Sequence, residues 1–184
     1  SLWDIEADMD VETAHMICLN CRILVVEFDN SFPGAAAAEN TAARLGATEI
    51  SNSYSISESQ VDGTIWSNRS AWNHAGIAIT ASAGDGNVGA QFPADLNTVV
   101  AVGGTKLNLN SDGSYNSESV WGLSTSGGTG SGCSGFADAY TSAAWWQSSV
   151  ANWSSTLCGK QRGIADVAAD ARSAYHAFRW LVQA

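Results

Sequence analysis

The sequence predicts an α/β fold in which a mostly parallel sheet is flanked by helices. Apolar runs of strand length recur along the first two thirds of the chain, helical patterns separate them, and glycines follow several of them. Strands that alternate with helices are typical of a parallel sheet, whose strands are buried on both faces and therefore apolar throughout. No repeat or linker divides the chain, so we expect residues 1–184 to form a single domain.

The individual elements follow from local patterns. Residues 5–17 have an apolar rhythm of about 3.6 residues, which is typical of a helix. Residues 31–47 combine an early proline, an alanine-rich body and a late glycine, which are helix start and stop signals. We expect a third helix over residues 61–76, strands over 22–28, 48–55, 77–84 and 98–105, and a Gly/Ser-rich β-hairpin region from residue 106 onward.

The charge balance excludes some partners. The formal net charge is -10 and only 8 residues are Lys or Arg. Nucleic-acid affinity depends on cationic contacts to phosphate, so nucleic acid is not expected as a partner. An anionic membrane surface is excluded for the same reason, and no apolar run approaches the roughly 18–20 residues of a membrane span. An acidic, charge-poor chain is typical of a secreted protein, and we expect this one to be secreted.

The four cysteines indicate disulfides and therefore an oxidising compartment. We expect Cys18 to pair with Cys21 and Cys133 with Cys158. The alternative is a zinc site built on the C-L-N-C stretch, but zinc ribbons usually repeat that knuckle and the second pair here is far apart in the chain. No metal site is predicted, because none of the histidines has a local partner, and "GGTGSG" lacks the lysine of a phosphate-binding loop.

Asp85 is the first candidate functional residue. It follows the apolar run of residues 77–84 directly, within a glycine loop. In open parallel sheets, ligands bind beyond the carboxyl ends of the strands, and Asp85 has that position. The alternative is purely structural, because Asp-Gly is a common turn pair.

Glu6 and Asp10 form the second candidate site. Their i, i+4 spacing places both carboxylates on one face of the predicted first helix. If the two share a proton, the pKa of one rises, which suits a general acid or base below neutral pH. The alternative is a solvated acidic face near the start of a helix, where the helix dipole favours negative charge.

Several stretches together resemble the sedolisin family, the serine-carboxyl peptidases of subtilisin-like fold. The E-x-x-x-D helix motif is present as "EADMD", and "ICLNCRILVVE" and "SNSYSISE" resemble the segments that follow it. The family's S-S-G-D-x-G and F-P-A…V-G-G-T motifs match "ASAGDGNVGAQFPADLNTVVAVGGT". "GSGCSGF", the Trp146-Gln147 pair and "RGIADVAADA" complete the series in the family's order.

The resemblance implies a role for each matching residue. Glu6 would be the general base, Asp10 the carboxylate that tunes it, and Asp85 a protonated donor in the oxyanion hole. A segment of three residues would bind the substrate backbone like an added strand, and glycines on the other side would leave room for the peptide. The segment that would act as an added strand consists of Ser53, Tyr54 and Ser55. The glycines are Gly127, Gly128 and Gly130. The expected partner is a polypeptide substrate.

The sequence also departs from the family pattern. The G-T-S-x-x-x-P motif that carries the nucleophilic serine does not occur in the 184 residues. The family's first strand and its calcium-binding loop are not recognisable either, so we expect a domain incomplete at both ends and no cofactor in this chain. The missing remainder of the domain is a further expected partner. Ser55 replaces the family's turn glycine, and Leu19 replaces a proline.

Three functions are therefore compatible with the sequence. The chain can be the core of a secreted, acid-acting serine endopeptidase whose nucleophile lies on another segment. It can be a sedolisin-like domain that binds peptides without cleaving them. It can also be a structural α/β remnant with no groove function.

Overall fold

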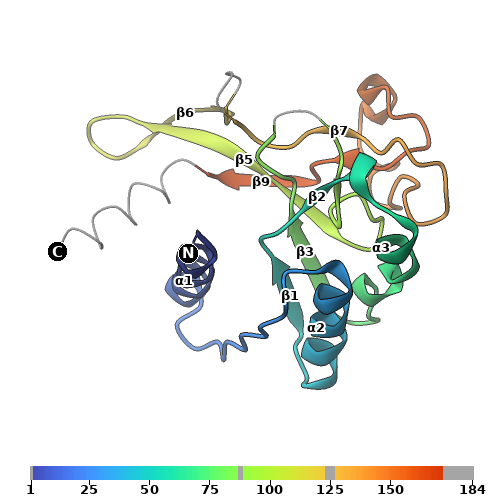
Figure 1. The fold of residues 1–184 in the computed structure, drawn as a ribbon. Coiled ribbons are helices and arrows are strands. Elements are labelled where there is room, and N and C mark those ends of the chain that lie inside the picture. Colours follow the sequence, from blue (N-terminus) through green and yellow to red (C-terminus); the bar gives the residue numbers. More distant parts are fainter. Residues whose placement is uncertain (1, 87–88, 123–126, 172–184) are drawn as a thin grey trace.

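A computed structural model describes residues 2–86, 89–122 and 127–171 (Figure 1). Its main sheet has five strands in the order β1-β3-β5-β6, with β9 paired to β5. The pairs β1–β3, β3–β5 and β5–β9 are parallel, and β5–β6 is antiparallel. The expectation of a mixed α/β fold with a mostly parallel sheet is confirmed.

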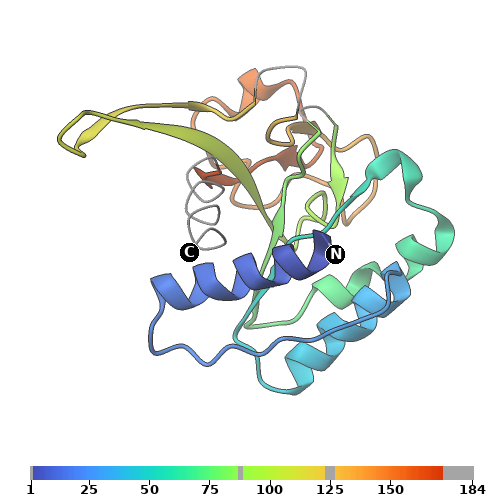
Figure 2. The same ribbon diagram turned by 60° about the vertical axis from the view of Figure 1, so that its left-hand side comes forward.

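Three parallel strands form the centre of this sheet. They are β1 (Glu49–Asn52), β3 (Ala78–Ser82) and β5 (Val100–Leu109). In register, Asn52 lies opposite Ala81 and Ser82 lies opposite Val102. The carboxyl ends of β1 and β3 therefore meet at one edge, and the segments that follow them start side by side. β5 continues past this edge and forms with β6 (Tyr115–Val120) a hairpin that projects from the body (Figures 1 and 2).

Two longer helices confirm the local sequence signals. α1 (Leu2–Ile17) and α2 (Phe32–Arg44) lie on different sides of β1 (Figure 1). α2 begins where its sequence predicts, because the Ser31 side chain accepts a hydrogen bond from the Gly34 N–H and a proline occupies the first turn. The helix expected over residues 61–76 is instead two short pieces, α3 (Gly63–Ser67) and the 3₁₀ helix η2 (Arg69–Trp72).

Short elements complete the fold around the sheet ends. β2 pairs with β4, and β7 pairs with β8, each in an antiparallel ladder. The shared feature of these elements is length, since each has only two to four residues. They are β2 (Ile56–Ser57), η1 (Glu58–Gln60), β4 (Gln91–Phe92), β7 (Gly132–Cys133), η3 (Trp153–Thr156), β8 (Gly163–Ile164) and β9 (Val167–Asp170).

The strand predicted over residues 22–28 is wrong. The structure gives this stretch no regular secondary structure, and Leu24 and Val25 are 49% and 57% exposed. An apolar run becomes a buried strand only when another strand pairs with it, and within the described residues no strand does so. Composition alone predicts the apolar character of the segment but not the presence of its partner.

The core lies between β3, β5 and α2, and aromatic rings hold its centre. Trp72 and Phe92 are fully buried and their ring centroids are 5.0 Å apart. Phe32 contacts Phe92 at 5.5 Å and Tyr54 at 6.2 Å, all in edge-to-face geometry. This chain of rings connects the helix α2 to the segment that follows β1, and so connects the core to the sheet edge.

A buried ion pair lies beneath the start of β5. Arg162 is fully buried and its guanidinium binds the Asp166 carboxylate. The guanidinium also donates to the carbonyl oxygens of Leu96, Val99 and Gly163, at 3.2, 2.9 and 2.8 Å. Burial works to raise the pKa of Asp166, but hydrogen bonds from Arg162 and Trp146 and the arginine charge lower it overall.

Both predicted cysteine pairs are present as disulfides. The structure joins Cys18 to Cys21 and Cys133 to Cys158. The second bond anchors the aromatic loop between residues 134 and 157 at the end of β7. Within the described ranges, no helix combines the length and the apolar composition that crossing a bilayer requires.

Asp95 is a buried carboxyl group that faces another carboxyl group. It is fully buried, and no N–H or O–H group among the described residues donates to either of its oxygens. Burial and the neighbouring Glu58 carboxylate raise the pKa of Asp95 to about 8. Burial beside the Glu58 carboxylate therefore favours the acid form of Asp95. Glu58 in turn accepts hydrogen bonds from the Ser134 hydroxyl and from the Gly135 N–H.

Asp166→Asn should destabilise the fold by about 3–5 kcal/mol, because it leaves the Arg162 charge buried without a counter-ion. Urea unfolding at neutral pH, followed by tryptophan fluorescence, measures this change. The matched control is Glu49→Gln, which removes a carboxylate from an exposed position on β1 and should change stability by less than about 0.5 kcal/mol. Equal effects of the two variants would contradict the role of the ion pair.

Asp95→Asn should make the protein more stable at pH 8 than the wild type. The pKa of Asp95 in the folded state, about 8, lies above the ordinary value of 3.8, so its stabilising contribution is complete below about pH 4 and is lost as pH rises toward 8. The asparagine cannot ionise and escapes this loss, which is on the order of a few kcal/mol. Thermal unfolding across this pH range tests the prediction, and parallel curves for both proteins would refute it.

Candidate functional site

The helix α1 brings its acidic pair to the end of β1. The Ser53 hydroxyl, one residue after β1, donates a hydrogen bond to Asp10 Oδ1 at 2.7 Å. Glu6 lies one turn earlier on the same helix and also interacts with the Ser53 side chain. The structure thus brings Glu6, Asp10 and Ser53 together, although the sequence separates the serine from Asp10 by 43 residues.

The electrostatics of the pair favour protonated carboxyl groups. Burial is the largest cause that raises the pKa of Glu6, followed by the negative charges of Asp10 and, more weakly, Asp85. Burial likewise raises the pKa of Asp10. The hydrogen bond from Ser53 opposes both shifts because it stabilises the ionised form. Such a pair exchanges protons at a higher pH than free carboxyl groups do, as a general acid or base requires.

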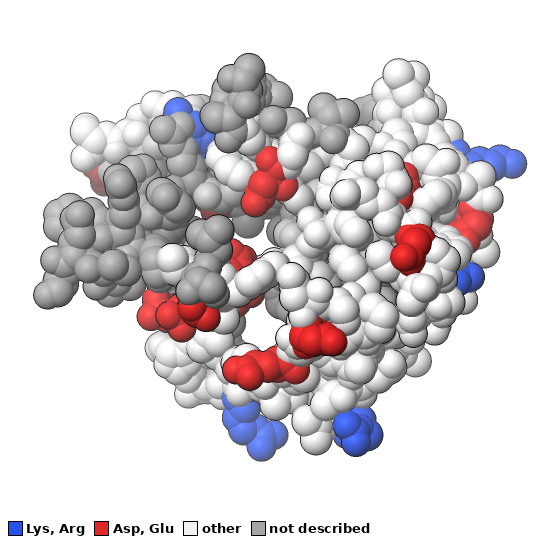
Figure 3. Space-filling model, viewed as in Figure 1, with Lys and Arg blue, Asp and Glu red and all other residues white. Residues whose placement is uncertain are grey.

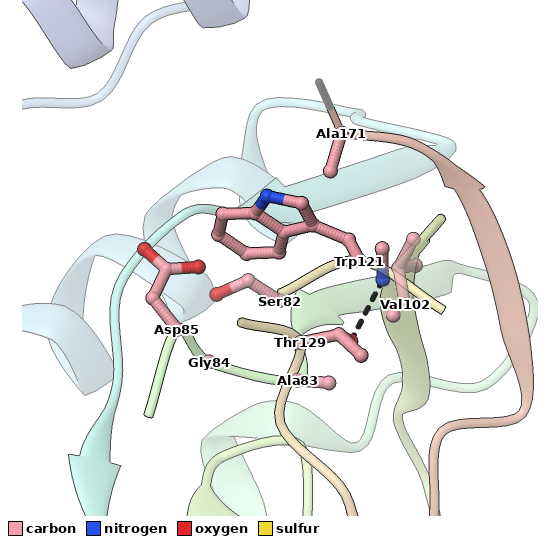
Figure 4. Close-up of a pocket in the computed structure, with 10 residues that line it drawn as sticks. Ser82, Ala83, Gly84, Asp85, Val102, Trp121, Thr129 and Ala171 are labelled. Carbon is pink, nitrogen blue, oxygen red and sulfur yellow. Dashed lines mark hydrogen bonds between the residues drawn. The ribbon is translucent and has the colours of Figure 1, made fainter. Parts of the chain in front are cut away.

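Asp85 lies at the carboxyl end of β3, as expected, and lines a cavity. The cavity has a volume of about 150 Å³ and is also lined by Ser82, Trp121 and Thr129. Figure 4 shows the Asp85 carboxyl beside the indole ring of Trp121 and the Ser82 hydroxyl below that ring. The Thr129 hydroxyl accepts a hydrogen bond from the Gly104 N–H at 2.8 Å and so joins the 127–130 segment to β5. The charge of Asp85 is also the weakest of the causes that raise the pKa of Glu6, which relates this carboxyl group to the acidic pair.

The expected glycine segment lies directly against the Asp85 loop. The Gly128 N–H donates to the Asp85 carbonyl at 3.0 Å, and the Gly130 N–H donates to the Gly84 carbonyl at 2.5 Å. A side chain at Gly130 would place its Cβ 1.7 Å from the Ala83 carbonyl oxygen. Backbone packing alone therefore excludes a side chain at position 130, independently of any bound peptide.

The segment that follows β1 turns its side chains in different directions. Tyr54 packs into the aromatic core, with its ring centroid 5.4 Å from that of Phe28, whereas Ser55 is exposed. Behind them, Glu39 of α2 is only 2% exposed, and burial raises the pKa of its carboxyl group to about 7. No motif in the sequence singles out Glu39. Its one signal is a lone acidic residue within the alanine-rich face that the helix buries.

The surroundings of the site are acidic. Figure 3 shows Asp and Glu side chains gathered around the hollow between α1 and the sheet, while Lys and Arg side chains lie toward the periphery of this face. Among the residues that the structure describes, no group of three or more His, Cys, Asp or Glu side chains is arranged to hold a metal ion.

A comparison with solved structures identifies the fold. The chain is similar to Pseudomonas sedolisin, a serine-carboxyl proteinase solved in complex with two molecules of pseudo-iodotyrostatin, with 27% identity and a TM-score of 0.64. The match covers 79% of this chain but 44% of that one, so the chain corresponds to less than half of the sedolisin. The chain has a sedolisin-like, subtilisin-like fold.

Further matches are more distant. The prenylagaramide maturation protease PagA is 21% identical, with a TM-score of 0.35 over 54% of this chain and 36% of its own. Sphericase is 24% identical, with a TM-score of 0.37 over 55% of this chain and 32% of its own. No protein-family model and no curated protein matches the sequence.

Ser53→Ala should raise the pKa of both Glu6 and Asp10, because the serine hydrogen bond favours their ionised forms. Asp10→Asn should act in the opposite direction on Glu6 and lower its pKa by removing a neighbouring negative charge. Carbon-detected NMR titration of the side-chain carboxyl groups measures both shifts. Ser55→Ala, at an exposed position two residues away, is the control and should leave both titrations in place.

Proposed function

We propose that this chain is the core of a secreted, acid-acting serine endopeptidase of the sedolisin type. The observation that carries the proposal is the meeting of Glu6, Asp10 and Asp85 at the carboxyl ends of β1 and β3. The sedolisin-like fold supports it, because parallel sheets of this kind place their chemistry at that edge. The two disulfides are compatible with an extracellular location.

Each carboxyl group has a proposed task. Glu6 takes the proton of a nucleophilic serine, and Asp10 adjusts the proton affinity of Glu6 through its charge. Asp85, at the cavity mouth, donates a hydrogen bond in its acid form to the oxygen of the tetrahedral intermediate. The proposal assigns the nucleophile to a polypeptide segment outside the 184 residues, which joins the domain as its partner.

Substrate binding is proposed for the segment after β1. Residues 53–55 bind an extended peptide by backbone hydrogen bonds, in the manner of an added strand. The cavity beside Asp85, with a volume of about 150 Å³, accommodates one substrate side chain. No cofactor takes part in this scheme.

The alternative function is peptide binding without cleavage. It requires the segment after β1 and the cavity beside Asp85 but no nucleophilic serine. The groove and cavity would then retain a peptide while the acidic pair has no serine to activate. A polypeptide ligand is common to both functions, which differ only in whether the peptide bond breaks.

We expect the chain to bind a dye-labelled peptide library saturably at about pH 4. Binding at about pH 8 should be weaker by at least about 10-fold. The reason is that the raised pKa values of Glu6 and Asp10 make the site less negative at low pH. Fluorescence anisotropy measures binding, and mass spectrometry of the recovered peptides detects cleavage. Asp85→Asn should extend binding to higher pH, whereas the Glu49→Gln control should not.

Three outcomes are distinguishable. Cleaved peptides establish the endopeptidase, and binding without cleavage by this chain, alone or joined to a serine-bearing segment, establishes the peptide-binding alternative. Absence of both binding and cleavage across this pH range would overturn the proposal and leave a structural domain.

A further inference from the structure

Two triplets in the sequence have the Asn-x-Ser pattern that accepts N-linked sugars, and the proposed function uses neither of them. They are Asn68-Arg69-Ser70 and Asn152-Trp153-Ser154. The pattern admits any middle residue except proline, so the sequence alone does not distinguish the two. A sugar chain is bulky and solvated, and it therefore needs an asparagine side chain that is free at the surface. The contacts of the two asparagines decide between them.

Asn68 lies in a packed helical junction. It is half-buried between α3 and η2, and its Nδ2 atom donates to the Thr64 carbonyl at 2.9 Å. The next residue, Arg69, is also held, because its guanidinium donates to the Trp66 carbonyl at 2.5 Å and lies 4.2 Å from the centre of the Tyr140 ring. A sugar chain on the Asn68 nitrogen would have to be accommodated inside this junction.

Asn152 has the opposite surroundings. It is exposed at the start of η3, and its side chain makes no capping hydrogen bond to that helix. Ser154, the third residue of the triplet, is exposed as well. The bulky middle residue, Trp153, is half-buried and held in the loop, because its Nε1 atom donates to the Gly159 carbonyl at 3.0 Å. The acceptor nitrogen and the serine of this triplet are therefore both open to solvent.

The backbone at Asn152 supplies a competing explanation for the asparagine. Its φ is 69°, in the left-handed region, where asparagine is tolerated better than most residues. Leu157, at the other end of η3, has a φ of 64°, so this loop takes up that conformation without an asparagine. The backbone explanation also assigns no task to Ser154.

We propose that Asn152 is the attachment site of an N-linked oligosaccharide, with Ser154 as the hydroxyl residue of the acceptor triplet, and that Asn68 stays unmodified in the folded protein. The inference goes beyond the proposed function and rests only on its secretory route, with which the two disulfides are compatible. The donor is an oligosaccharide linked through pyrophosphate to a membrane lipid.

The transfer is a substitution at the first sugar. The Asn152 Nδ2 atom forms a bond to the anomeric carbon of that sugar. The bond between this carbon and the pyrophosphate oxygen breaks, and the lipid pyrophosphate leaves with the electron pair. The amide nitrogen releases one proton, and nothing is oxidised or reduced. A membrane-bound oligosaccharyltransferase is the catalyst, so this chain contributes only the acceptor.

The position of the triplet suits a sugar chain. The aromatic loop that carries it is anchored by the Cys133–Cys158 disulfide, and two apolar residues of this loop, Val150 and Leu157, are 60% and 92% exposed. A solvated oligosaccharide at Asn152 reduces the contact of such apolar side chains with other molecules. Figures 1 and 2 show the part of the loop around residue 150, in orange, apart from the helix α1, so the sugar leaves the acidic pair accessible.

The test is site mapping on the 184-residue chain, secreted from cultured eukaryotic cells behind a cleavable leader. Peptide-N-glycosidase removes N-linked sugar and converts the asparagine that carried it to aspartate, which mass spectrometry of the peptides locates. We expect a mobility shift on treatment and conversion at Asn152, without conversion at Asn68. Because the transfer precedes export, protein retained in the cells is mapped as well.

Variants of the triplet separate this reaction from others. Asn152→Gln should abolish the mobility shift, and Ser154→Ala should abolish it although the asparagine is retained. Both positions are exposed, so neither change removes a buried contact. Ser154→Thr keeps the hydroxyl and should keep the shift. The matched control is Asn68→Gln, which removes the other triplet and should also keep the shift.

An unmodified Asn152 in the wild type overturns the inference. Conversion at Asn68 that equals or exceeds conversion at Asn152 in the secreted protein also overturns it, as does a shift that persists in Ser154→Ala. The mapping requires no peptide, so its result is separate from that of the binding experiment. If the peptide library does not bind and Asn152 carries sugar, the proposed function falls and the modification site stands. If peptides bind and Asn152 is unmodified, the proposed function stands and only the modification site is refuted.

Discussion

The pairing of Arg162 with Asp166 is the interaction on which the arrangement of the sheet depends. Asp166 Oδ2 accepts a hydrogen bond from the Ala101 N–H at 2.8 Å, while Oδ1 accepts from the side chains of Trp146 and Gln147, each at 2.8 Å. Together with the carbonyl groups bound by Arg162, the ion pair joins the turn before β5, the aromatic loop and the segment leading into β9. A buried pair of this kind is tolerated because every charge has several hydrogen-bond partners.

This network also constrains the candidate site. β5 lies between β3 and β9, and the Ala83 N–H donates to the Val102 carbonyl at 2.8 Å. The start of the Asp85 loop is thereby fixed to the strand that Asp166 anchors. On the other side, α2 and its aromatic contacts fix the segment that carries Ser53. Two rigid supports thus meet at the edge where Glu6, Asp10 and Asp85 gather, which is the condition for a preorganised site.

Local patterns in the sequence predicted the main helices and strands around the site. They missed the contacts between residues that lie far apart in the chain. α1, α2, β1, β3 and β5 follow from periodicity, caps and apolar runs within a few residues. The stretch 22–28 has an equally clear pattern, yet a strand also needs a neighbour that no local pattern reveals. The i, i+4 spacing of Glu6 and Asp10 shows that they share a helix face, but not that Ser53 lies against it. Arg162 was missed as a structural support for the same reason, because the Leu96 and Val99 carbonyl groups that it binds lie far from it in the chain.

The carboxyl groups place opposite demands on pH, and together they define a working range. Asp166 stabilises the fold only when ionised, and its lowered pKa allows this below the ordinary value of 3.8. Asp95 and Glu39 stabilise it only when protonated, with pKa values of about 8 and about 7. The three contributions are therefore largest together near about pH 4, and those of Asp95 and Glu39 decline as the pH rises toward their pKa values. The fold is therefore most stable in acidic conditions, in which the proposed chemistry of Glu6 also operates. Burial is the shared physical cause, because it raises the pKa values of Asp95 and Glu39 in the core and of Glu6 and Asp10 in the site.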